Sequence, residues 1–486
     1  MQQVFNPYLP EGVYIPDGEP HVFGGRLYIY GSHDLYRSGR YCAGDYVVWS
    51  APADDLSAFT ACGTAYRRRR RGNRLGLHCL WAPDCTRGAD GRYYLYFCYD
   101  FENRIRVAVS GRPDGPFEYL GVVRHGSGRP YGTAAGDKMC FDPGVFTDED
   151  GSTYLYSGFS PDAGLQKMLH MRGIRNVDGR GGQAMRLQSD MLTLAGDPLP
   201  CIPGFENSAG TGFEGHEMYE ASSMRKVGRR YYFIYSTFQS HELGYAIGDA
   251  PLGPFRFGGV LISNADLHEG EDVSAARCYW GNNHGSIEKV GEHWYVFYHR
   301  QTNKNEQTRQ GCAERIEIGA DGHIRRAEVT SCGLNGGPLA GEGRYPAYIA
   351  CHLRSAAGAC KCSNRLLERG RYRQHPCIGE YAPGRQCILG MRTGASAGFR
   401  YFACRGQTDI FVAVRGGGGK LRVSTAPQGE ACGEIALEPC KNWRTFAASA
   451  SLPQGTAALY FTYEGDGLLD FSEFTLRPHG GAKERT

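Results

Sequence analysis

Residues 25–34 read GRLYIYGSHD, and four later stretches repeat this pattern: GRYYLYFCYD (91–100), GSTYLYSGFS (151–160), GRRYYFIYST (228–237) and GEHWYVFYHR (291–300). Each stretch starts with a glycine, which suits a tight turn, and continues with aromatic and β-branched residues, which are typical of strands. Each is therefore predicted to be a β-strand that the chain enters from a turn.

The spacing of these strands predicts the architecture. Their glycines are 60 to 77 residues apart, and no long helical periodicity lies between them. A unit of that length holds about four short strands with their loops, and five such sheets around an axis form a β-propeller. We therefore expect an all-β protein whose residues 1–340 form a five-bladed β-propeller.

A polar residue precedes each repeated strand by seven to nine positions. The first strand of every propeller blade lines the central channel, so equivalent positions should converge at one end of it. The pattern predicts a ring of four carboxyls and one imidazole, formed by Asp17, Asp84, Asp142, Glu220 and His284.

Such a ring is costly, because crowded carboxylates lose hydration and repel one another. It points to a function, either binding of a hard cation or acid/base chemistry by carboxyls with separated pKa values. Aromatic neighbours such as Tyr14, Trp81 and Tyr219 favour sugars, which stack on aromatic faces. Any single member could still cap a strand, and for Asp84 a structural role is as well supported as a functional one.

The overall charge excludes some partners. A formal net charge of +3 over 486 residues creates no strong global attraction for nucleic acid or an anionic membrane. The local exception is YRRRRRGNR at residues 66–74, which we interpret as a solvated loop, with a polyanion-binding patch as the alternative. We therefore expect no nucleic-acid and no membrane partner.

The N-terminus and the cysteines suggest a compartment. MQQVFNPYLPEG lacks the features of a secretory signal, and no window approaches the roughly 18 apolar residues needed to span a bilayer. The 18 cysteines are spread along the chain, many in apolar stretches, and are interpreted mainly as buried free thiols. The expectation is a cytoplasmic protein, or a secreted one if a signal has been removed.

The repeat stops near residue 340. Short β-like runs such as AGFRYFAC (397–404) and TDIFVAVRG (408–416) then follow at the spacing of a sandwich. Residues 341–486 are therefore predicted to form a separate β-sandwich domain.

The propeller motifs resemble glycoside hydrolase family 43 across about residues 5–340. The stretches YIPDGEPHVFGGRLYIYGSHD, LWAPDCTRGADGRYYLYF, FDPGVFTDEDGSTYLYSG, YEASSMRKVGRRYYFIYS and GNNHGSIEKVGEHWYVFYHR carry this resemblance, blade by blade. It implies a five-bladed propeller that hydrolyses glycosidic bonds of plant polysaccharides with inversion. The C-terminal domain more loosely resembles carbohydrate-binding module family 6.

The resemblance implies three catalytic residues. Asp17 corresponds to the general base, Asp142 to the aspartate that orients the acid and tunes its pKa, and Glu220 to the general acid. Glu220 stands in YEASS, where the more widespread family motif reads Glu-Gly-Pro, so Glu214 and Glu217 in FEGHE are rivals if the register is shifted. Glu220 is preferred because it has the offset of the repeat.

Further residues have weaker assignments. His284 occupies the place of a channel histidine and could anchor a structural Ca²⁺ or Na⁺ through water, although no cofactor is expected to be required. Substrate-binding candidates are Trp81, His33, Asp34 and Arg300, each of which could equally be structural.

The function expected from the resemblance is release of terminal α-L-arabinofuranosyl or β-D-xylosyl units from oligosaccharides or polysaccharides. Alternatives are a β-D-galactofuranosidase, an endo-arabinanase of the same fold, or a non-catalytic sugar-binding propeller. Loops decide among sugars and between exo and endo action, so the sequence leaves substrate and oligomeric state open.

Overall fold

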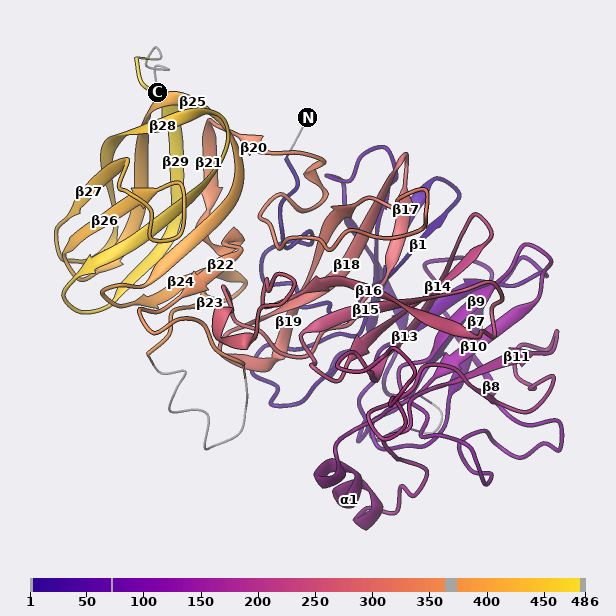
Figure 1. The fold of residues 1–486 in the computed structure, drawn as a ribbon. Helices are drawn as coiled ribbons and strands as arrows, with labels where there is room; N and C mark the ends of the chain where they lie inside the picture. The colour runs from indigo at the N-terminus through magenta and orange to yellow at the C-terminus, as the bar shows by residue number, and fades with distance from the viewer. Residues whose placement is uncertain (1–2, 71–72, 363–373, 481–486) are drawn as a thin grey trace.

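The computed structural model describes residues 3–70, 73–362 and 374–480. Within these residues, five antiparallel sheets follow one another from residue 19 to residue 316. Their innermost strands contact one another in ring order, β1 with β5, β5 with β9, β9 with β13, and β17 with β1. This is the predicted five-bladed β-propeller, which forms the purple and salmon part of the molecule (Figure 1).

The blades are built as follows. Blade 1 contains β1 (Glu19–Phe23), β2 (Arg26–Tyr30), β3 (Tyr46–Pro52) and β4 (Thr60–Tyr66). Blade 2 contains β5 (Asp84–Arg87), β6 (Tyr93–Phe97), β7 (Arg106–Ser110) and β8 (Glu118–Val122). Blade 3 contains β9 (Gly144–Thr147), β10 (Thr153–Ser157), β11 (Gln183–Leu187) and β12 (Leu199–Pro200). Blade 4 contains β13 (Met218–Val227), β14 (Arg230–Thr237), β15 (Glu242–Gly248) and β16 (Phe255–Ser263). Blade 5 contains β17 (Ile287–Val290), β18 (His293–Thr302) and β19 (Asn305–Ile316).

The repeated sequence stretches are the second strands, β2, β6, β10, β14 and β18. Most of their residues are buried, because each second strand lies between two neighbouring strands of its blade and between two neighbouring blades. Their aromatic rings fill the space between blades. Phe97 packs on Tyr66 with ring centroids 4.8 Å apart, and Tyr156 on Phe233 at 5.4 Å. Such contacts explain why one pattern recurs five times.

The N-terminal segment closes the ring. Tyr8 donates its backbone N–H to the carbonyl of Gly311 in β19 at 3.3 Å. The buried Asn6 side chain pairs with the backbone of Ala313, donating to its carbonyl at 3.0 Å and accepting from its N–H at 2.9 Å. The chain that leads into blade 1 thus lies along the last strand of blade 5 and ties the two together.

A loop insertion in blade 3 carries helix α1 (Ala163–Met171), which projects from one end of the propeller (Figure 1). The helix begins after Asp162, whose carboxylate accepts the N–H groups of Gly164 and Leu165. Its residues Leu165, Met168 and Leu169 pack into a cluster with Phe159. No helix in the described ranges is long and apolar enough to cross a membrane.

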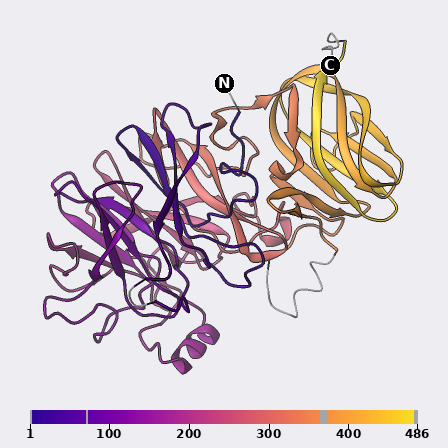
Figure 2. The same ribbon diagram turned by 180° about the vertical axis from the view of Figure 1, so that it is seen from behind.

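The C-terminal part is a β-sandwich, shown in orange and yellow and seen from behind in Figure 2. Its strands are β20 (Leu339–Ala340), β21 (Gly343–Pro346), β22 (His352–Arg354), β23 (Cys377–Ala382), β24 (Arg385–Met391), β25 (Ser396–Gly416), β26 (Gly419–Ser424), β27 (Gly433–Leu437), β28 (Cys440–Gly465) and β29 (Leu469–Pro478). The long strands β25 and β28 pair with register shifts between Phe399 and Phe402 and between Arg405 and Gln407. Such irregularities let a strand bend, so one strand can contribute to both layers.

Buried polar groups join the two domains. Asp266, which follows β16, accepts from His352 and from Arg400 of the sandwich, each at 2.7 Å. On the other side, the Tyr14 hydroxyl donates to the Glu380 carboxylate at 2.6 Å. These charge-assisted contacts tie the domains at two places. All 18 cysteines are free and most are buried, as the sequence suggested.

Candidate active site

Two of the predicted carboxyls occupy unusual backbone positions. Asp17 has φ of 55° and Asp142 has φ of 41°, both in the left-handed region, and each lies two residues before the first residue of its strand, β1 or β9. A non-glycine residue there carries strain of order 1 kcal/mol or more, which persists only where the surroundings hold it. The two residues are only 4% and 5% exposed. The same strained turn thus places an aspartate at the start of the innermost strand in blades 1 and 3.

Glu220 is placed by a different irregularity. It lies within β13, where the pairing with β14 shifts between Glu220 and Ser223, and Ala221 has φ of 65°. A bulge of this kind re-aims a side chain relative to the regular alternation of a strand. Glu220 is 9% exposed, and its charge interacts with those of Asp142 and Asp17. The three carboxyls therefore form one electrostatic group.

Arg309 of β19 is the counter-charge of Asp17. Its Nη1 donates to Asp17 Oδ1 at 2.7 Å, while Nε and Nη2 donate to the two oxygens of Asp34 at 2.9 and 3.0 Å. Burial alone would raise the pKa of Asp17, but the charge of Arg309, together with smaller contributions from His299 and His284, outweighs it and holds that pKa well below its usual value. Asp17 is therefore an ionised carboxylate.

Two more groups fix Asp17. The Ser32 hydroxyl donates to its Oδ2, and its backbone N–H donates to His299 Nδ1 at 3.3 Å. His299 Nε2 lies 2.7 Å from the carbonyl of Asn282, which can only accept, so Nε2 carries the ring proton and Nδ1 is the acceptor. Burial also lowers the pKa of His299, which agrees with a neutral ring.

Glu220 has the opposite protonation state. Burial and then repulsion by Asp142 raise its pKa to about 8. Burial raises the pKa of Asp142 as well, but His284 Nδ1 lies 3.4 Å from Asp142 Oδ2 and favours its charged form. Of the two coupled carboxyls, Glu220 is therefore the one that holds a proton at neutral pH. The site contains an ionised carboxylate and a protonated carboxylic acid, as acid/base hydrolysis requires.

Asp84 does not join this group, which corrects the predicted ring of five. The β5–β6 hairpin connects Arg87 to Tyr93 with a five-residue loop, whereas the β1–β2 hairpin has a two-residue loop. A fixed offset from the glycine that begins each repeated stretch therefore does not identify equivalent positions in the blades. Asp84 pairs opposite Tyr96 as Glu19 does opposite Tyr30, so Asp84 is equivalent to Glu19 and lies about 7 Å deeper than the site.

Asp84 has a structural role in this deeper layer. Its carboxylate accepts the backbone N–H groups of Cys85 and Val145, each at 2.7 Å, and lies 2.7 Å from His21 Nε2. It therefore links the innermost strands of blades 1, 2 and 3. Of the predicted ring, Asp17, Asp142, Glu220 and His284 come together.

The deeper layer also contains the group that best suits a cation. Glu19 Oε2 accepts from Ser223 at 2.9 Å and from Arg225 at 3.2 Å, whereas the buried Oε1 has no hydrogen-bond partner among the described residues and lies 3.7 Å from His284 Nε2. An unsatisfied carboxylate oxygen is the donor type that Ca²⁺ and Na⁺ prefer. Glu19, His21 and Asp84 also bring ligand atoms within 4.8 Å of one another. The residues present fit a hard cation near His284.

Aromatic rings extend outward from Asp142. Trp81 contacts Phe141 with ring centroids 4.5 Å apart, and Phe141 stacks on Phe159 at 4.4 Å. Trp81 is only partly buried, so part of its face remains accessible. Its position beside the neighbour of Asp142 suits the predicted role in sugar binding.

The other substrate-binding candidates differ in position. His33 is partly buried, and its Nδ1 must donate to the carbonyl of Asp45 at 3.0 Å, which leaves Nε2 as an acceptor. Asp34 is 1% exposed and both of its oxygens bind Arg309. Asp34 therefore orients Arg309 and has no free face for a sugar.

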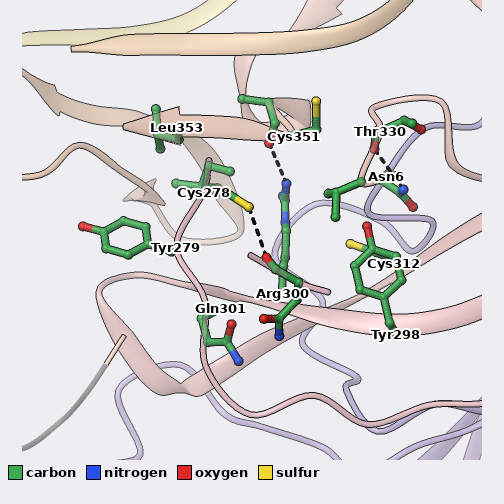
Figure 3. A pocket seen from close by; sticks show the side chains of 14 residues that line it. Asn6, Cys278, Tyr279, Tyr298, Arg300, Gln301, Cys312, Thr330, Cys351 and Leu353 are labelled. Carbon is green, nitrogen blue, oxygen red and sulfur yellow. Dashed lines mark hydrogen bonds between the residues drawn. The ribbon is translucent and has the colours of Figure 1, made fainter. Parts of the chain in front are cut away.

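Arg300 lies elsewhere, at the junction of the domains. Because side chains alternate along a strand, His299 of β18 faces Asp17 and Arg300 faces the other way. The Arg300 guanidinium donates to the carbonyls of Tyr348 and Ala350 at 2.8 and 3.2 Å. Figure 3 shows it beside Cys278, Tyr298 and Cys351. These residues line a cavity of about 30 Å³, which has room for water but not for a sugar. The substrate-binding role expected for Arg300 is therefore not supported.

Glu214 and Glu217, the alternative candidates for the acid, lie outside the cluster of Asp17, Asp142 and Glu220. Glu214 is exposed and accepts the backbone N–H of Gly210 at 2.5 Å. Glu217 accepts from Ser208 at 3.1 Å and from the N–H of Gly215 at 3.0 Å. Both therefore stabilise the loop that leads into β13, and Glu220 is the carboxyl in the channel.

Sequence reasoning missed Arg309, His299 and Glu19. Glu19 could have been found, because it stands two residues after Asp17 and must face the same side of the strand. His299 directly precedes Arg300, which the sequence suggested as a substrate-binding residue. Arg309 lies on the third strand of blade 5, and nothing in the local sequence indicates that it reaches Asp17, 292 positions away.

Comparisons with known proteins identify the family of the chain. The model for glycosyl hydrolases family 43 matches residues 16–324. A xylosidase/arabinosidase from Thermoclostridium stercorarium is 44% identical over 485 residues, which cover 98% of this chain and 99% of that protein. A β-xylosidase from Xylanibacter ruminicola is 31% identical over 340 residues, covering 64% of this chain and 96% of that protein.

Solved structures show the same fold. A GH43_1 enzyme from Xanthomonas citri has a TM-score of 0.50 at 28% identity, with 65% of this chain and 91% of that chain covered. An arabinoxylan arabinofuranohydrolase from Bacillus subtilis, at 20% identity and a TM-score of 0.50, covers 98% of this chain and 97% of that chain, so the likeness in fold spans both domains. With its propeller, its three carboxyls and these relatives, the chain belongs to glycoside hydrolase family 43 and is an inverting glycosidase.

Proposed function

We propose that this enzyme releases terminal β-D-xylosyl or α-L-arabinofuranosyl units from xylan-derived oligosaccharides. The observation that carries the proposal is the pairing of ionised Asp17 with protonated Glu220 across one channel. The relative that is 44% identical over nearly the whole chain is named a xylosidase/arabinosidase, which supports the choice of pentosyl units.

Asp17 acts as the general base. An inverting enzyme needs a carboxylate that removes a proton from water while the water attacks the anomeric carbon. Arg309 and Ser32 hold the Asp17 carboxylate in one orientation, and Arg309 keeps it ionised. A carboxylate has about four lone-pair sites, so these two contacts leave room for a water.

Glu220 acts as the general acid. It gives its proton to the glycosidic oxygen as the bond to the leaving sugar breaks. Burial and then the negative charge of Asp142 keep that proton on Glu220 at neutral pH, and His284, 3.4 Å from Asp142, compensates the charge of Asp142. Trp81 offers an apolar face for the sugar ring at the edge of the site.

Hydrolysis of a panel of substrates tests the proposal. The panel contains para-nitrophenyl β-D-xyloside, α-L-arabinofuranoside and β-D-galactofuranoside, xylotriose and linear arabinan, with the anomer of the released sugar followed by proton NMR. We expect release of xylose or arabinose with inverted configuration, and its loss in Asp17→Asn. Cleavage of internal arabinan bonds would support an endo-arabinanase instead. Binding of the oligosaccharides without hydrolysis would support a non-catalytic propeller.

We also propose that a Ca²⁺ or Na⁺ ion binds in the channel near His284, with Glu19 Oε1 as its carboxylate donor and water completing its shell. Bound there, the ion would add positive charge beside Asp142. Thermal unfolding of chelator-treated protein should shift upward when Ca²⁺ is added, and Glu19→Gln should abolish the shift. An equal shift in Glu19→Gln would place the ion elsewhere.

A further inference from the structure

Exposed arginines of three loops, including described members of the arginine run, lie at the end of the propeller where the carboxyls are found. We define the arginine rim as six exposed residues on the loops of blades 1, 2 and 3 at that end: Arg37, Arg67, Arg69, Arg70, Arg74 and Arg172. The described parts of these loops are residues 31–45, 67–70, 73–83 and 158–182, and they share the end of the channel at which Asp17 and Asp142 lie.

The charges of the rim are uncompensated. Within the described ranges, no rim arginine has a carboxylate within ion-pair distance, whereas the neighbouring Arg40 pairs with Asp100 at 2.8 Å. The whole chain has a net charge of only +3, so this excess is local. An exposed cluster of unpaired charges of one sign creates a field that attracts ligands of opposite charge.

Hydrogen bonds anchor the described residues on both sides of the loop that displays most of the rim. Asn73 is 4% exposed, and its side chain donates to the carbonyls of Arg68 and His78 at 3.1 and 2.8 Å and accepts the N–H of His78 at 3.1 Å. The Arg68 N–H donates to Asp45 at 2.8 Å, which ties this loop to the loop that carries His33. The arginine side chains are therefore presented from a fixed base, which favours binding over a merely solvating role.

A series of aromatic side chains in contact connects Arg172 of the rim to Phe141, which precedes Asp142. The Arg172 guanidinium lies 5.0 Å from the ring centre of Phe101, which contacts Trp81 at 5.5 Å. Trp81 contacts Phe141, the residue before Asp142, at 4.5 Å. A sugar chain that reaches from the site across Trp81 would therefore extend toward the rim.

We propose that the arginine rim binds carboxylate groups on the substrate, so that the enzyme favours uronic-acid-substituted oligosaccharides over neutral ones. Guanidinium groups bind carboxylates through two parallel hydrogen bonds, and cationic rims raise the rate of encounter with anionic ligands. This inference rests on the proposed function, because it concerns substituents on the same oligosaccharides.

The position of the rim favours an acidic saccharide over nucleic acid. A nucleic acid carries a charge on every unit and would bring phosphates toward the ionised Asp17, which repels them. A branched oligosaccharide can place a neutral sugar at the carboxyls and a single carboxylate at the rim.

Binding to an inactive enzyme tests this idea independently of hydrolysis. The Glu220→Gln protein is titrated calorimetrically with a neutral xylo-oligosaccharide and with one of equal length that carries one glucuronosyl branch. We expect the branched compound to bind about 5- to 10-fold more tightly at low salt, with the advantage lost in 1 M NaCl, where the Debye length is about 3 Å. Adding Arg69→Gln, Arg70→Gln and Arg74→Gln should remove the advantage and leave neutral binding unchanged.

A charge-matched control separates the rim from net charge. Arg256, Arg315 and Arg477 are exposed and lie on β16, β19 and β29, away from the rim. Replacing these three by Gln should preserve the preference for the branched compound. Equal binding of both compounds by the parent protein, an equal loss in the control, or equal rim-dependent binding of a single-stranded oligonucleotide would overturn the proposal. Failure of the proposed function would instead appear as no hydrolysis of neutral substrates by wild type.

Discussion

Arg309 Nη1 lies 2.7 Å from Asp17 Oδ1, and the same guanidinium binds both oxygens of Asp34. All three side chains are at least 95% buried. Asp17, the proposed general base, is thus one end of a buried carboxylate–guanidinium–carboxylate chain that joins blade 5 to blade 1. The same pairing that keeps Asp17 ionised also closes the propeller ring.

Replacing Arg309 by Met should shift the acidic limb of the pH profile upward. The base works only when ionised, and Arg309 depresses its pKa, so without Arg309 the pKa of Asp17 rises and activity is lost at a higher pH than in wild type. The profile of kcat/KM against pH measures this shift. The variant should also lose about 3–5 kcal/mol of stability, because it leaves two buried carboxylates unpaired.

Arg309→Lys is the matched control, since it retains the charge but not the forked geometry. Compared with Arg309→Met, this variant should return the acidic limb closer to its wild-type pH but recover less of the lost stability. An unchanged acidic limb in Arg309→Met, in protein shown to be folded by circular dichroism, would mean that Arg309 does not tune the base.

Replacing Glu220 by Gln should reduce kcat by about 10²–10⁴ on substrates with a poor leaving group, which is the usual contribution of general acid catalysis. Substrates with a para-nitrophenolate leaving group need less protonation and should lose less. In wild type, activity should fall as the pH rises through about 8, because Glu220 then loses its proton. Glu217→Gln, whose side chain lies in the preceding loop, serves as control and should retain activity. The reverse result would move the acid to Glu217.

Replacing Asp142 by Asn should move the basic limb downward. Repulsion by Asp142 raises the pKa of Glu220, so removing that charge lowers the pKa and Glu220 loses its proton at a lower pH. The kcat–pH profile of Asp142→Asn should therefore fall off below pH 8, with a reduced maximum. A basic limb at the wild-type position would indicate that burial alone sets the pKa of Glu220.

The sequence was sufficient to predict the propeller and most of its site, for a physical reason. The second strand of each blade is buried on all sides, so its composition repeats strongly and fixes the period. Asp17, Asp142, Glu220 and His284 stand at the start of the adjacent strand and could be located by counting. The same offset wrongly placed Asp84 beside Asp17, whereas Asp84 is equivalent to Glu19. The reason is that the hairpin loops differ in length between blades.

Other parts of the site depend on contacts that no local pattern records. Arg309 meets Asp17 only because the last blade closes against the first. Asp34 and Arg300 are the charged residues that end two of the repeated stretches, but the partners of both are elsewhere in the chain. The residue type marks these side chains as candidates for a functional role. Only the three-dimensional packing distinguishes a sugar contact from a structural ion pair or a contact between domains.

Replacing Arg300 by Met should affect stability and not catalysis. Arg300 donates to the carbonyls of Tyr348 and Ala350, so the variant leaves these acceptors of the domain junction without their donor. The loss of such hydrogen bonds costs about 1–3 kcal/mol, which should lower the midpoint of thermal unfolding. At temperatures below that midpoint, kcat and KM on xylotriose should stay within about twofold of the wild-type values. The reason is that Arg300 makes no contact with Asp17, Asp142 or Glu220. A rise in KM of tenfold or more with unchanged unfolding would instead support the sugar-binding role that the sequence suggested.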